Sequence, residues 1–189
     1  MTKQALRAQY KTKRATLDSR ERLRLDDLLL LQFQHLNYAS ISTVMSYWPL
    51  SDAAEPNTHL FTGYLRHMIP ALTIVYPVTD NSSLQMTPVV ITEDTVYRTS
   101  SLGITEPKEG EVIPVENIDL VLVPLLAFDK KGYRVGFGKG FYDRFLAACR
   151  EDIVTIGFSY FEPVDNITDT DQFDVPLTYC ITPQNIYEF

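Results

Sequence analysis

The sequence predicts an α/β fold, a three-layer α/β/α sandwich with a mostly parallel, Rossmann-like sheet. Two observations predict it. β-type runs at residues 42–48 and 72–76 flank a helical pattern at residues 58–68, which is the order of a βαβ unit. Residues 118–124 form a continuous apolar run, typical of a strand that a parallel sheet buries on both faces. Ligands of such folds bind at the carboxyl ends of the strands, so we expect the site there.

The first predicted helix begins at Thr2, which can cap it, and turns Leu6, Tyr10 and Leu17 toward the core. All 24 acidic residues of the chain lie beyond residue 17. The helix therefore carries cations without acidic neighbours, and such a stripe is either a clamp on an anion or a solvated face. The stripe consists of Lys3, Arg7, Lys11 and Arg14.

Later elements follow from capping residues and apolar runs. Asp18 or Ser19 can cap a second helix that runs to Leu36, and Asn57 or Thr58 can cap the helix at residues 58–68. Residues 84–90 and 95–98 indicate shorter strands around a variable excursion, residues 141–150 a helix, and residues 153–158 another buried strand. Without repeats or a Gly/Ser-rich linker, we expect residues 1–189 to form a single domain.

Composition excludes several classes of protein. The net charge of −7 argues against a nucleic-acid partner, which would require a surplus of Lys and Arg. No apolar run approaches the roughly 18 residues of a membrane span, and the N-terminus lacks the apolar core of a signal peptide. Cys149 and Cys180 have no metal-ligand spacing. We therefore expect a cytoplasmic protein without a membrane partner.

Residues 136–140 read Gly-Phe-Gly-Lys-Gly and lie between a buried strand and a predicted helix. Glycines let backbone N–H groups approach a phosphate, and a helix N-terminus adds a positive dipole end. Yet neither standard phosphate motif is present, because Tyr133 stands at the first glycine of a Walker A loop and Phe141 at the last glycine of a dinucleotide loop. By general rules the segment is either a phosphate site or a plain strand-to-helix connection.

The whole segment resembles the signature of the 5-formyltetrahydrofolate cyclo-ligase family. The matching residues are Pro124, Phe128, Asp129, Gly132, Arg134, Gly136, Gly138, Lys139, Gly140, Tyr142 and Asp143. Further similar segments follow in the correct order along nearly the full chain. They begin at Lys3 (KQALR), Tyr47 (YWPL), Glu55 (EPNT), Gly103 (GITEP), Ile156 (IGF), Asp174 (DVPL) and Ile181 (IT).

Three positions depart from the family pattern. Leu125 stands where many relatives carry Gly, so we expect a small loop shift. Ala53 and Ala54 precede Glu55 where relatives have a shorter or more polar connection, which leaves Leu50 less firmly aligned than Glu55. Phe137 stands where Arg is common, so Arg134 and Lys139 must carry more of the contact with phosphate.

The resemblance implies a CoA-transferase-like form of the sandwich and an ATP- and Mg²⁺-dependent enzyme. That enzyme converts 5-formyltetrahydrofolate to 5,10-methenyltetrahydrofolate through an iminophosphate intermediate and releases ADP and phosphate. It implies catalytic roles for Arg134 and Lys139 and a magnesium ligand in Asp143. The implied folate contacts are Leu50, Glu55 and Tyr142. The implied ATP contacts are Lys3, Gln4, Arg7, Arg134, Val135, Gly136, Phe137, Gly138, Lys139, Gly140, Phe141 and Tyr142. We expect a monomer.

Other readings of these residues stay open. Asp143 can merely favour the dipole of the helix that it begins, and Tyr47 and Trp48 are core aromatics as readily as walls of a ligand site. A non-catalytic folate- or nucleotide-binding protein would keep the same fold. A sugar-phosphate isomerase or transferase would need a Glu or His base at a strand end. His35, His59 and His67 show no catalytic spacing, and we assign them no role.

Overall fold

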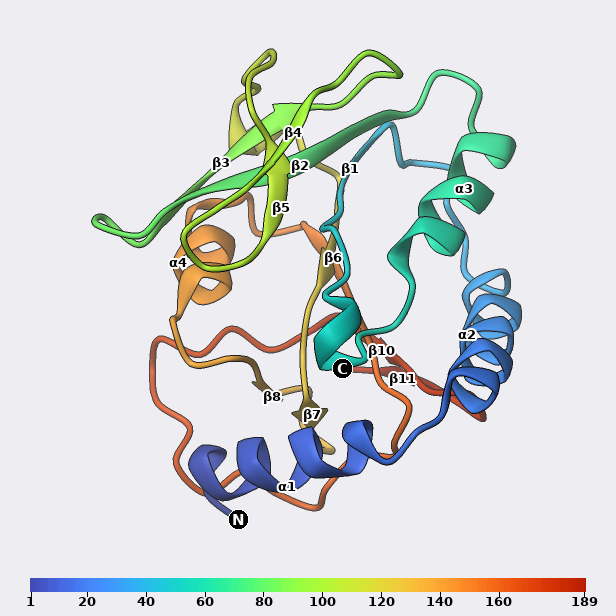
Figure 1. The fold of residues 1–189 in the computed structure, drawn as a ribbon, viewed down its shortest axis with the longest axis vertical. Coiled ribbons are helices and arrows are strands. Elements are labelled where there is room, and N and C mark those ends of the chain that lie inside the picture. The colour runs from blue at the N-terminus through green and yellow to red at the C-terminus, as the bar shows by residue number, and fades with distance from the viewer.

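The computed structural model describes residues 1–189, and Figure 1 gives the arrangement of its elements. Each long helix begins at a polar cap. Thr2 Oγ1 accepts a hydrogen bond from Ala5 N at 3.3 Å, and Asp18 Oδ1 accepts one from Glu21 N at 2.8 Å. The helices are α1 (Lys3–Ala15), α2 (Ser19–Phe33), α3 (Thr58–Met68) and α4 (Phe141–Ala148), with short 3₁₀ helices η1 (Ser51–Ala53) and η2 (Val115–Asn117).

A seven-stranded sheet forms the centre of the fold, in the order β11-β10-β9-β6-β1-β2-β3. The five inner strands run parallel, while β3 and β11 pair antiparallel at the two edges. The prediction of an α/β fold with a mostly parallel sheet is therefore confirmed. The strands are β1 (Thr43–Met45), β2 (Thr73–Asp80), β3 (Gln85–Val90), β6 (Leu120–Val123), β9 (Val154–Phe158), β10 (Tyr179–Ile181) and β11 (Ile186–Glu188).

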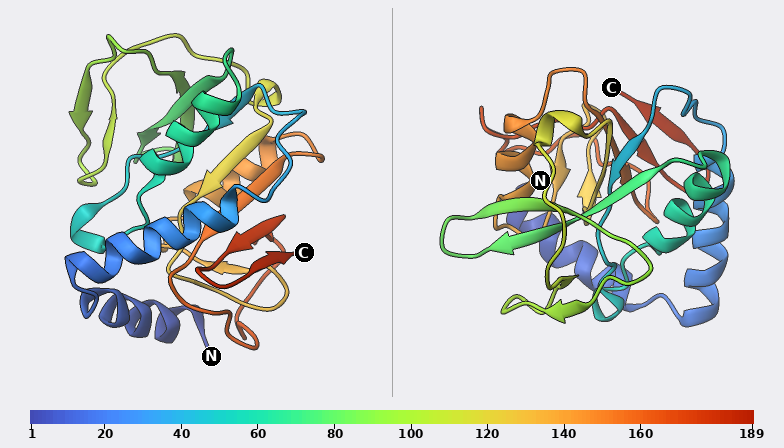
Figure 2. Two further views of the ribbon diagram at one scale, coloured as in Figure 1. Left: turned by 90° about the vertical axis from the view of Figure 1, so that its right-hand side faces the viewer. Right: turned by 90° about the horizontal axis from the view of Figure 1, so that it is seen from above.

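Helices cover both faces of this sheet, and the central strand β6 contributes to both cores (Figure 2). Leu120 and Leu122 pack with residues of α2 and α3, including Phe33 and Phe61. The alternate residues of β6, Val121 and Val123, pack with α4 on the opposite face. Because side chains alternate along a strand, a strand with helices on both sides must be apolar throughout.

Helix α1 lies across one end of the sheet and packs against a small hairpin, β7 (Ala127–Phe128) with β8 (Arg134–Val135). Leu6 and Tyr10 are buried here as predicted. Arg14 departs from the predicted stripe of cations, because it is 1% exposed and lies on the core side of the helix. Arg14 lies four positions after Tyr10, so the helical repeat places both side chains on the same buried face.

A second hairpin, β4 (Tyr97–Thr99) with β5 (Thr105–Pro107), packs on β2 above the main sheet. The strand predicted at residues 42–48 is much shorter, since only Thr43–Met45 pairs as a strand before the chain turns away. The second helix ends at Phe33 and not at Leu36, and Tyr38 Oη donates to the Phe33 carbonyl at 2.7 Å. No helix combines the length and the apolar composition that a membrane crossing requires.

Candidate functional site

A cavity of about 960 Å³ opens at the carboxyl ends of β1 and β6. Tyr47 and Trp48 enter it just after β1, and Pro124 directly after β6. This is the edge of the sheet at which the fold class predicted the site. The predicted site residues that line the cavity are Lys3, Arg7, Leu50, Glu55, Arg134, Gly136, Phe137, Gly138, Lys139, Gly140, Phe141, Tyr142 and Asp143.

Two predicted ATP contacts lie outside this lining. The side chain of Gln4 is exposed on α1, and Val135 is fully buried in a cluster with Leu6 and Tyr10. A buried valine side chain cannot touch a ligand, so any contact of Val135 with a nucleotide would have to come from its backbone.

The glycine loop, residues 136–140, presents a row of free backbone donors. None of its N–H groups donates a hydrogen bond to the protein. Gly138 and Gly140 have φ values of 98° and 72°, which side-chain-bearing residues rarely adopt. Helix α4 follows at once and has no side-chain cap, so the N–H groups of its first turn face the same space. Such a nest of unpaired N–H groups at a helix N-terminus suits an anion.

Helix α1 contacts the glycine loop through Arg7. Arg7 Nε donates to the Gly136 carbonyl at 2.9 Å. The guanidinium also lies against Gly138, where a Cβ atom would come within 3.2 Å of Arg7 Cζ. Gly138 is therefore required twice, by its backbone conformation and by the close approach of Arg7.

The two lysines at this end of the cavity differ in their partners. Lys3 Nζ is held between both carboxylate oxygens of Asp174, at 2.5 and 2.6 Å. The Lys139 side chain is exposed, and its ammonium group has no hydrogen-bond or ion-pair partner in the protein. Lys139 is thus the free cation beside the unpaired N–H groups, and an anionic ligand would be its natural partner.

Arg134 and Asp143 form a partly buried ion pair at 2.8 Å. Arg134 also donates to the Val175 carbonyl at 2.6 Å, and Asp143 Oδ1 accepts from Val175 N at 3.2 Å. Burial lowers the pKa of the Arg134 guanidinium, and the charge of Asp143 opposes that shift. The pair therefore ties β8 and α4 to the segment before β10, while Asp143 Oδ2 makes no hydrogen bond.

Carboxylates near this pair are few. Asp143 and Asp174 both line the cavity, from α4 and from the segment at residues 171–175. No three His, Cys, Asp or Glu side chains cluster as a ready metal site. Magnesium commonly takes one or two carboxylates and completes its shell with phosphate oxygens and water, so Asp143 with Asp174 fits it in the presence of a phosphate ligand.

Glu55 also lines the cavity and is 8% exposed. It follows Ala54, a non-glycine residue with φ of 48°, and its Oε2 accepts from Leu50 N at 2.8 Å. Burial raises the pKa of the Glu55 carboxyl, while the Leu50 N–H and the positive charge of Arg14 lower it. A buried carboxylate with one backbone hydrogen bond keeps acceptor capacity for a ligand.

Apolar and aromatic side chains form a further wall of the cavity. Trp48 packs edge-on against Tyr97 of β4, with ring centroids 5.0 Å apart. Opposite lies the turn of the β4–β5 hairpin, which contributes Leu102 and Ile104. Pro77, Thr79 and Met86 from β2 and β3 complete the wall. Among these residues, the sequence pointed only to Trp48 as a possible wall of a ligand site. It did not point to those of β2, β3 and the hairpin, because that region was predicted only as short strands around a variable excursion.

Buried polar residues shape the frame of the site. Asp129 is fully buried, and its carboxylate accepts from the N–H groups of Lys131 and Tyr133 at 3.0 and 3.1 Å, which closes the turn between β7 and β8.

Leu125, the first departure from the family pattern, fits against Gly157, where a Cβ atom would lie 2.4 Å from the leucine. The bulk of Leu125 is thus accommodated by the absence of a side chain at Gly157.

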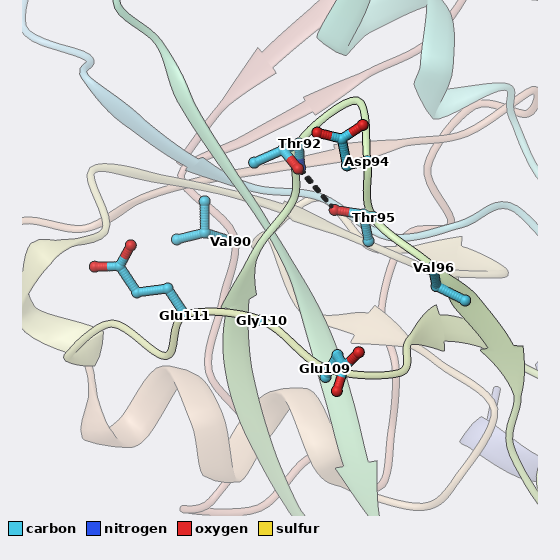
Figure 3. A pocket seen from close by; sticks show the side chains of 8 residues that line it. All are labelled: Val90, Thr92, Asp94, Thr95, Val96, Glu109, Gly110 and Glu111. Carbon is cyan, nitrogen blue, oxygen red and sulfur yellow. Dashed lines mark hydrogen bonds between the residues drawn. The ribbon is translucent and has the colours of Figure 1, made fainter.

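A second, smaller pocket of about 210 Å³ lies beside the end of β3 (Figure 3). It contains the acidic residues Asp94, Glu109 and Glu111. Their carboxylates point in different directions and do not converge. This arrangement offers no cation site.

Comparison with known proteins places the chain in one family. The model of the 5-formyltetrahydrofolate cyclo-ligase family matches residues 1–183. The 5-formyltetrahydrofolate cyclo-ligase of Haemophilus influenzae is 41% identical over 88 residues, 44% of this chain and 46% of the relative. The chain thus spans about half the length of that relative. The enzyme of the same name from Mycoplasma pneumoniae aligns over 97% of this chain and all of its own, with 29% identity.

A solved structure leads to the same conclusion. The NMR structure of Aquifex aeolicus 5,10-methenyltetrahydrofolate synthetase superposes with a TM-score of 0.81 at 29% identity and covers 100% of this chain and 93% of its own. The superposition covers the whole of this chain and therefore includes α1 and the glycine loop. From the family model and the shared fold together, the chain belongs to the 5-formyltetrahydrofolate cyclo-ligase family.

Proposed function

We propose that this protein is an ATP- and Mg²⁺-dependent 5-formyltetrahydrofolate cyclo-ligase. The observation that carries the proposal is a single cavity whose lining has two chemically different parts. One part, the phosphate end, has free backbone N–H groups and the unpaired Lys139, which suit phosphate. The other part has a buried carboxylate, Glu55, with aromatic and apolar side chains, which suits a flat ring with a hydrogen-bond-donating edge.

The reaction needs phosphorylation because a formamide is a poor electrophile and its oxygen a poor leaving group. The formyl oxygen attacks the γ-phosphorus of ATP, and the bond to ADP breaks. N10 then adds to the activated formyl carbon, loses its proton, and expels inorganic phosphate that carries the former formyl oxygen. The product is the 5,10-methenyl bridge. Such a reaction asks the protein for positioning and charge neutralisation, not for a covalent intermediate on a side chain.

The phosphate end of the cavity supplies both. The N–H groups of the glycine loop and Lys139 neutralise the developing charge on the transferred phosphoryl group. Arg7 keeps the loop in place through the Gly136 carbonyl. Arg134 is engaged by Asp143 and Val175, so its proposed catalytic role is exerted as a buried charge beside the phosphates.

Asp143 and Asp174 are the residues that would hold Mg²⁺. Asp143 has one carboxylate oxygen without a hydrogen bond, whereas Lys3 occupies both oxygens of Asp174. A magnesium ion bound there would neutralise phosphate charge next to these carboxylates. Lys3 would then have to release an oxygen of Asp174 to the ion.

We also propose that the protein acts as a monomer in the cytoplasm. Both cysteines are free, as is usual in the reducing cytoplasm.

The test is turnover. The purified protein, incubated with ATP, Mg²⁺ and 5-formyltetrahydrofolate, should form the methenyl chromophore and ADP in equal amounts. Lys139→Ala should lower kcat/KM by on the order of 100-fold, since one lost charge-assisted contact to the transition state costs about 2.7 kcal/mol. Lys131→Ala, a change of the same kind at another exposed lysine, should leave turnover intact.

Binding of both ligands without chromophore or ADP would instead support the non-catalytic folate or nucleotide binder. Binding of neither would remove the proposal altogether. An equal loss in Lys139→Ala and Lys131→Ala would remove the glycine loop from the mechanism.

A further inference from the structure

Arg144 is a cation of the cavity lining to which the proposed reaction assigns no role. It lies on α4, its side chain is exposed, and it forms no ion pair with an acidic residue. Its Nη1 donates instead to the carbonyls of Lys139 and Gly140, both at 3.2 Å. These two hydrogen bonds hold one end of the guanidinium against the glycine loop, so the group is oriented before a ligand arrives.

The other edge of the Arg144 guanidinium is free. Neither Nε nor Nη2 donates a hydrogen bond within the protein. The N–H groups of these two nitrogens are parallel and match the two oxygens of a carboxylate or a phosphate. Because the planar group is already held at Nη1, little side-chain freedom is lost when an anion binds to this edge. Arg144 therefore has the geometry of a bidentate anion site.

The orientation of the glycine loop shows that Arg144 does not share the anion of the phosphate end. In a trans peptide the N–H and the C=O point in opposite directions. Because the carbonyls of Lys139 and Gly140 point toward Arg144, the N–H groups of Gly140 and Phe141 point away from it. A phosphate bound by these N–H groups lies on the opposite side of the loop. Arg144 is thus available to a second anion.

The two substrates of the proposed reaction differ in where they carry negative charge. ATP carries it only in the phosphates, whereas 5-formyltetrahydrofolate carries it in the two carboxylates of its glutamate, at the end of the molecule opposite the pterin ring. Glu55, which suits the ring, is buried, whereas Arg144 and Ala147 are exposed lining residues three positions apart on one face of α4. A long ligand with its ring at Glu55 brings its far end to the exposed part of the lining.

We propose that Arg144 binds a glutamate carboxylate of the folate substrate and selects for substrates with an anionic tail. The proposal rests on the proposed function. The carboxylate is remote from the formyl oxygen that reacts, so this contact is equally strong in the ground state and in the transition state. Loss of such a contact raises KM and leaves kcat unchanged.

The test compares two substrates that differ only in the charge of the tail. They are 5-formyltetrahydrofolate and its diamide, in which both glutamate carboxylates are neutral amides. At saturating ATP, the wild type should show a KM on the order of tenfold lower for the charged substrate. Arg144→Met should remove this difference by raising the KM for the charged substrate. Any effect of the variant on the glycine loop applies to both substrates and cancels in the ratio of their KM values.

Two further variants sharpen the comparison. Arg24→Met removes an exposed arginine without an ion pair outside the cavity, and it should leave the ratio at its wild-type value. Ala147→Glu places a carboxylate on the same face of α4 as Arg144, where it competes with the substrate for the guanidinium. The KM for the charged substrate should rise several-fold in this variant, whereas the KM for the diamide should stay the same.

Equal KM values for both substrates in the wild type, or a wild-type ratio in Arg144→Met, would overturn the proposal. A rise in the KM for ATP with equal losses on both folates would also overturn it, because Arg144 would then only support the glycine loop. Wild-type turnover distinguishes these failures from that of the proposed function. An active wild type without preference for the charged tail removes only the carboxylate site, whereas a wild type that makes no methenyl product removes both.

Discussion

Glu55 is a residue whose surroundings oppose its charge. Burial raises the pKa of its carboxyl, and the Leu50 N–H and Arg14 compensate only in part. The residue before it, Ala54, adopts a left-handed conformation that costs a non-glycine residue free energy. A site that keeps a costly charge in a costly conformation is typical of a functional residue and not of one that stabilises the fold.

Glu55→Gln should therefore impair folate binding with only a small effect on stability. At neutral pH the free energy of unfolding should change by less than about 1 kcal/mol, because the glutamine amide oxygen can still accept from Leu50 N. The removal of one buried charge is offset by the loss of the countercharge of the buried Arg14. KM for 5-formyltetrahydrofolate should rise by at least about tenfold. Urea unfolding and steady-state kinetics on the same preparation check both effects.

Because the pKa of Glu55 is raised in the folded protein, the direction in which pH changes its contribution to stability is fixed. A carboxyl with a raised pKa in the folded state favours folding most below the unfolded pKa, near 4.5, and loses that contribution as the pH rises through the folded value. Folate binding needs the ionised form and should weaken in the opposite direction, as the pH falls through the raised pKa. A folate KM that stays flat with pH in the wild type, and not only in Glu55→Gln, would contradict this role.

Asp143 differs from Glu55 because its partner is charged. Asp143→Asn leaves an acceptor for Arg134 but removes the countercharge of a guanidinium that is 8% exposed. The free energy of unfolding should fall by about 1–3 kcal/mol. The concentration of Mg²⁺ needed for half-maximal turnover should increase, and kcat should fall more than folate binding weakens.

Asp119→Asn is the matched control, since Asp119 also pairs with an arginine, Arg150, but lies outside the cavity. It should lose stability without a change in the Mg²⁺ requirement. If Asp143→Asn and Asp119→Asn show the same Mg²⁺ dependence as the wild type, Asp143 is a structural partner of Arg134 only.

At the scale of elements, the local patterns were predictable and the long-range ones were not. Capping residues and apolar spacing located α1 and α3 closely, and the glycine loop located the start of α4, because helices are specified by neighbours in sequence. Strands β10 and β11 were not predicted individually. Their short segments, Tyr179–Ile181 and Ile186–Glu188, become strands only by pairing with β9 and with each other.

The burial of Arg14 is a further example. Its charge predicts an exposed position with the other cations of α1, although its place four positions after Tyr10 puts it on the buried face of the helix. A buried guanidinium needs a hydrogen-bond acceptor. That acceptor is the Leu125 carbonyl, more than a hundred residues away in the chain, and no local pattern reveals it.

Helix α1 contributes both to packing and to the cavity, and a truncation cannot separate the two. A chain that starts at Leu17 lacks Leu6, Tyr10 and Arg14, so it should lose its fold as well as any ATP affinity. Lys3→Met is the sharper change. KM for ATP should rise roughly tenfold with little effect on KM for the folate. Lys13→Met, on the same helix outside the cavity, is the control, and equal effects of both variants would indicate a solvated face.

For the whole molecule, the sequence predicted the glycine loop and Glu55 as parts of the site but not the apolar wall of the cavity. The glycine loop and the α1 cations were predicted from residue types and the family resemblance, and the structure brings them to one cavity with Glu55. The wall of Pro77, Met86, Leu102 and Ile104 was not predicted, since these residues come together only when a distant hairpin packs on β2. Apolar residues in short strands carry no sign of whether they face a core or a ligand.

The architecture of the whole molecule suits the proposed reaction between two substrates. The lining of one cavity combines residues of α1, the glycine loop and α4 with residues of β2, β3 and the β4–β5 hairpin. In the proposed function, the formyl oxygen of a folate and the γ-phosphorus of ATP meet within this cavity. Proximity of this kind supplies much of the rate enhancement in a two-substrate reaction.

The most direct test of this account follows the formyl oxygen. With 5-formyltetrahydrofolate labelled by oxygen-18 in the formyl group, the account predicts one labelled oxygen in each inorganic phosphate released, as measured by mass spectrometry, in step with the methenyl product. Labelled phosphate should require both ATP and active enzyme. Methenyl product accompanied by unlabelled phosphate would contradict the transfer of a phosphoryl group to the formyl oxygen, and with it the central claim.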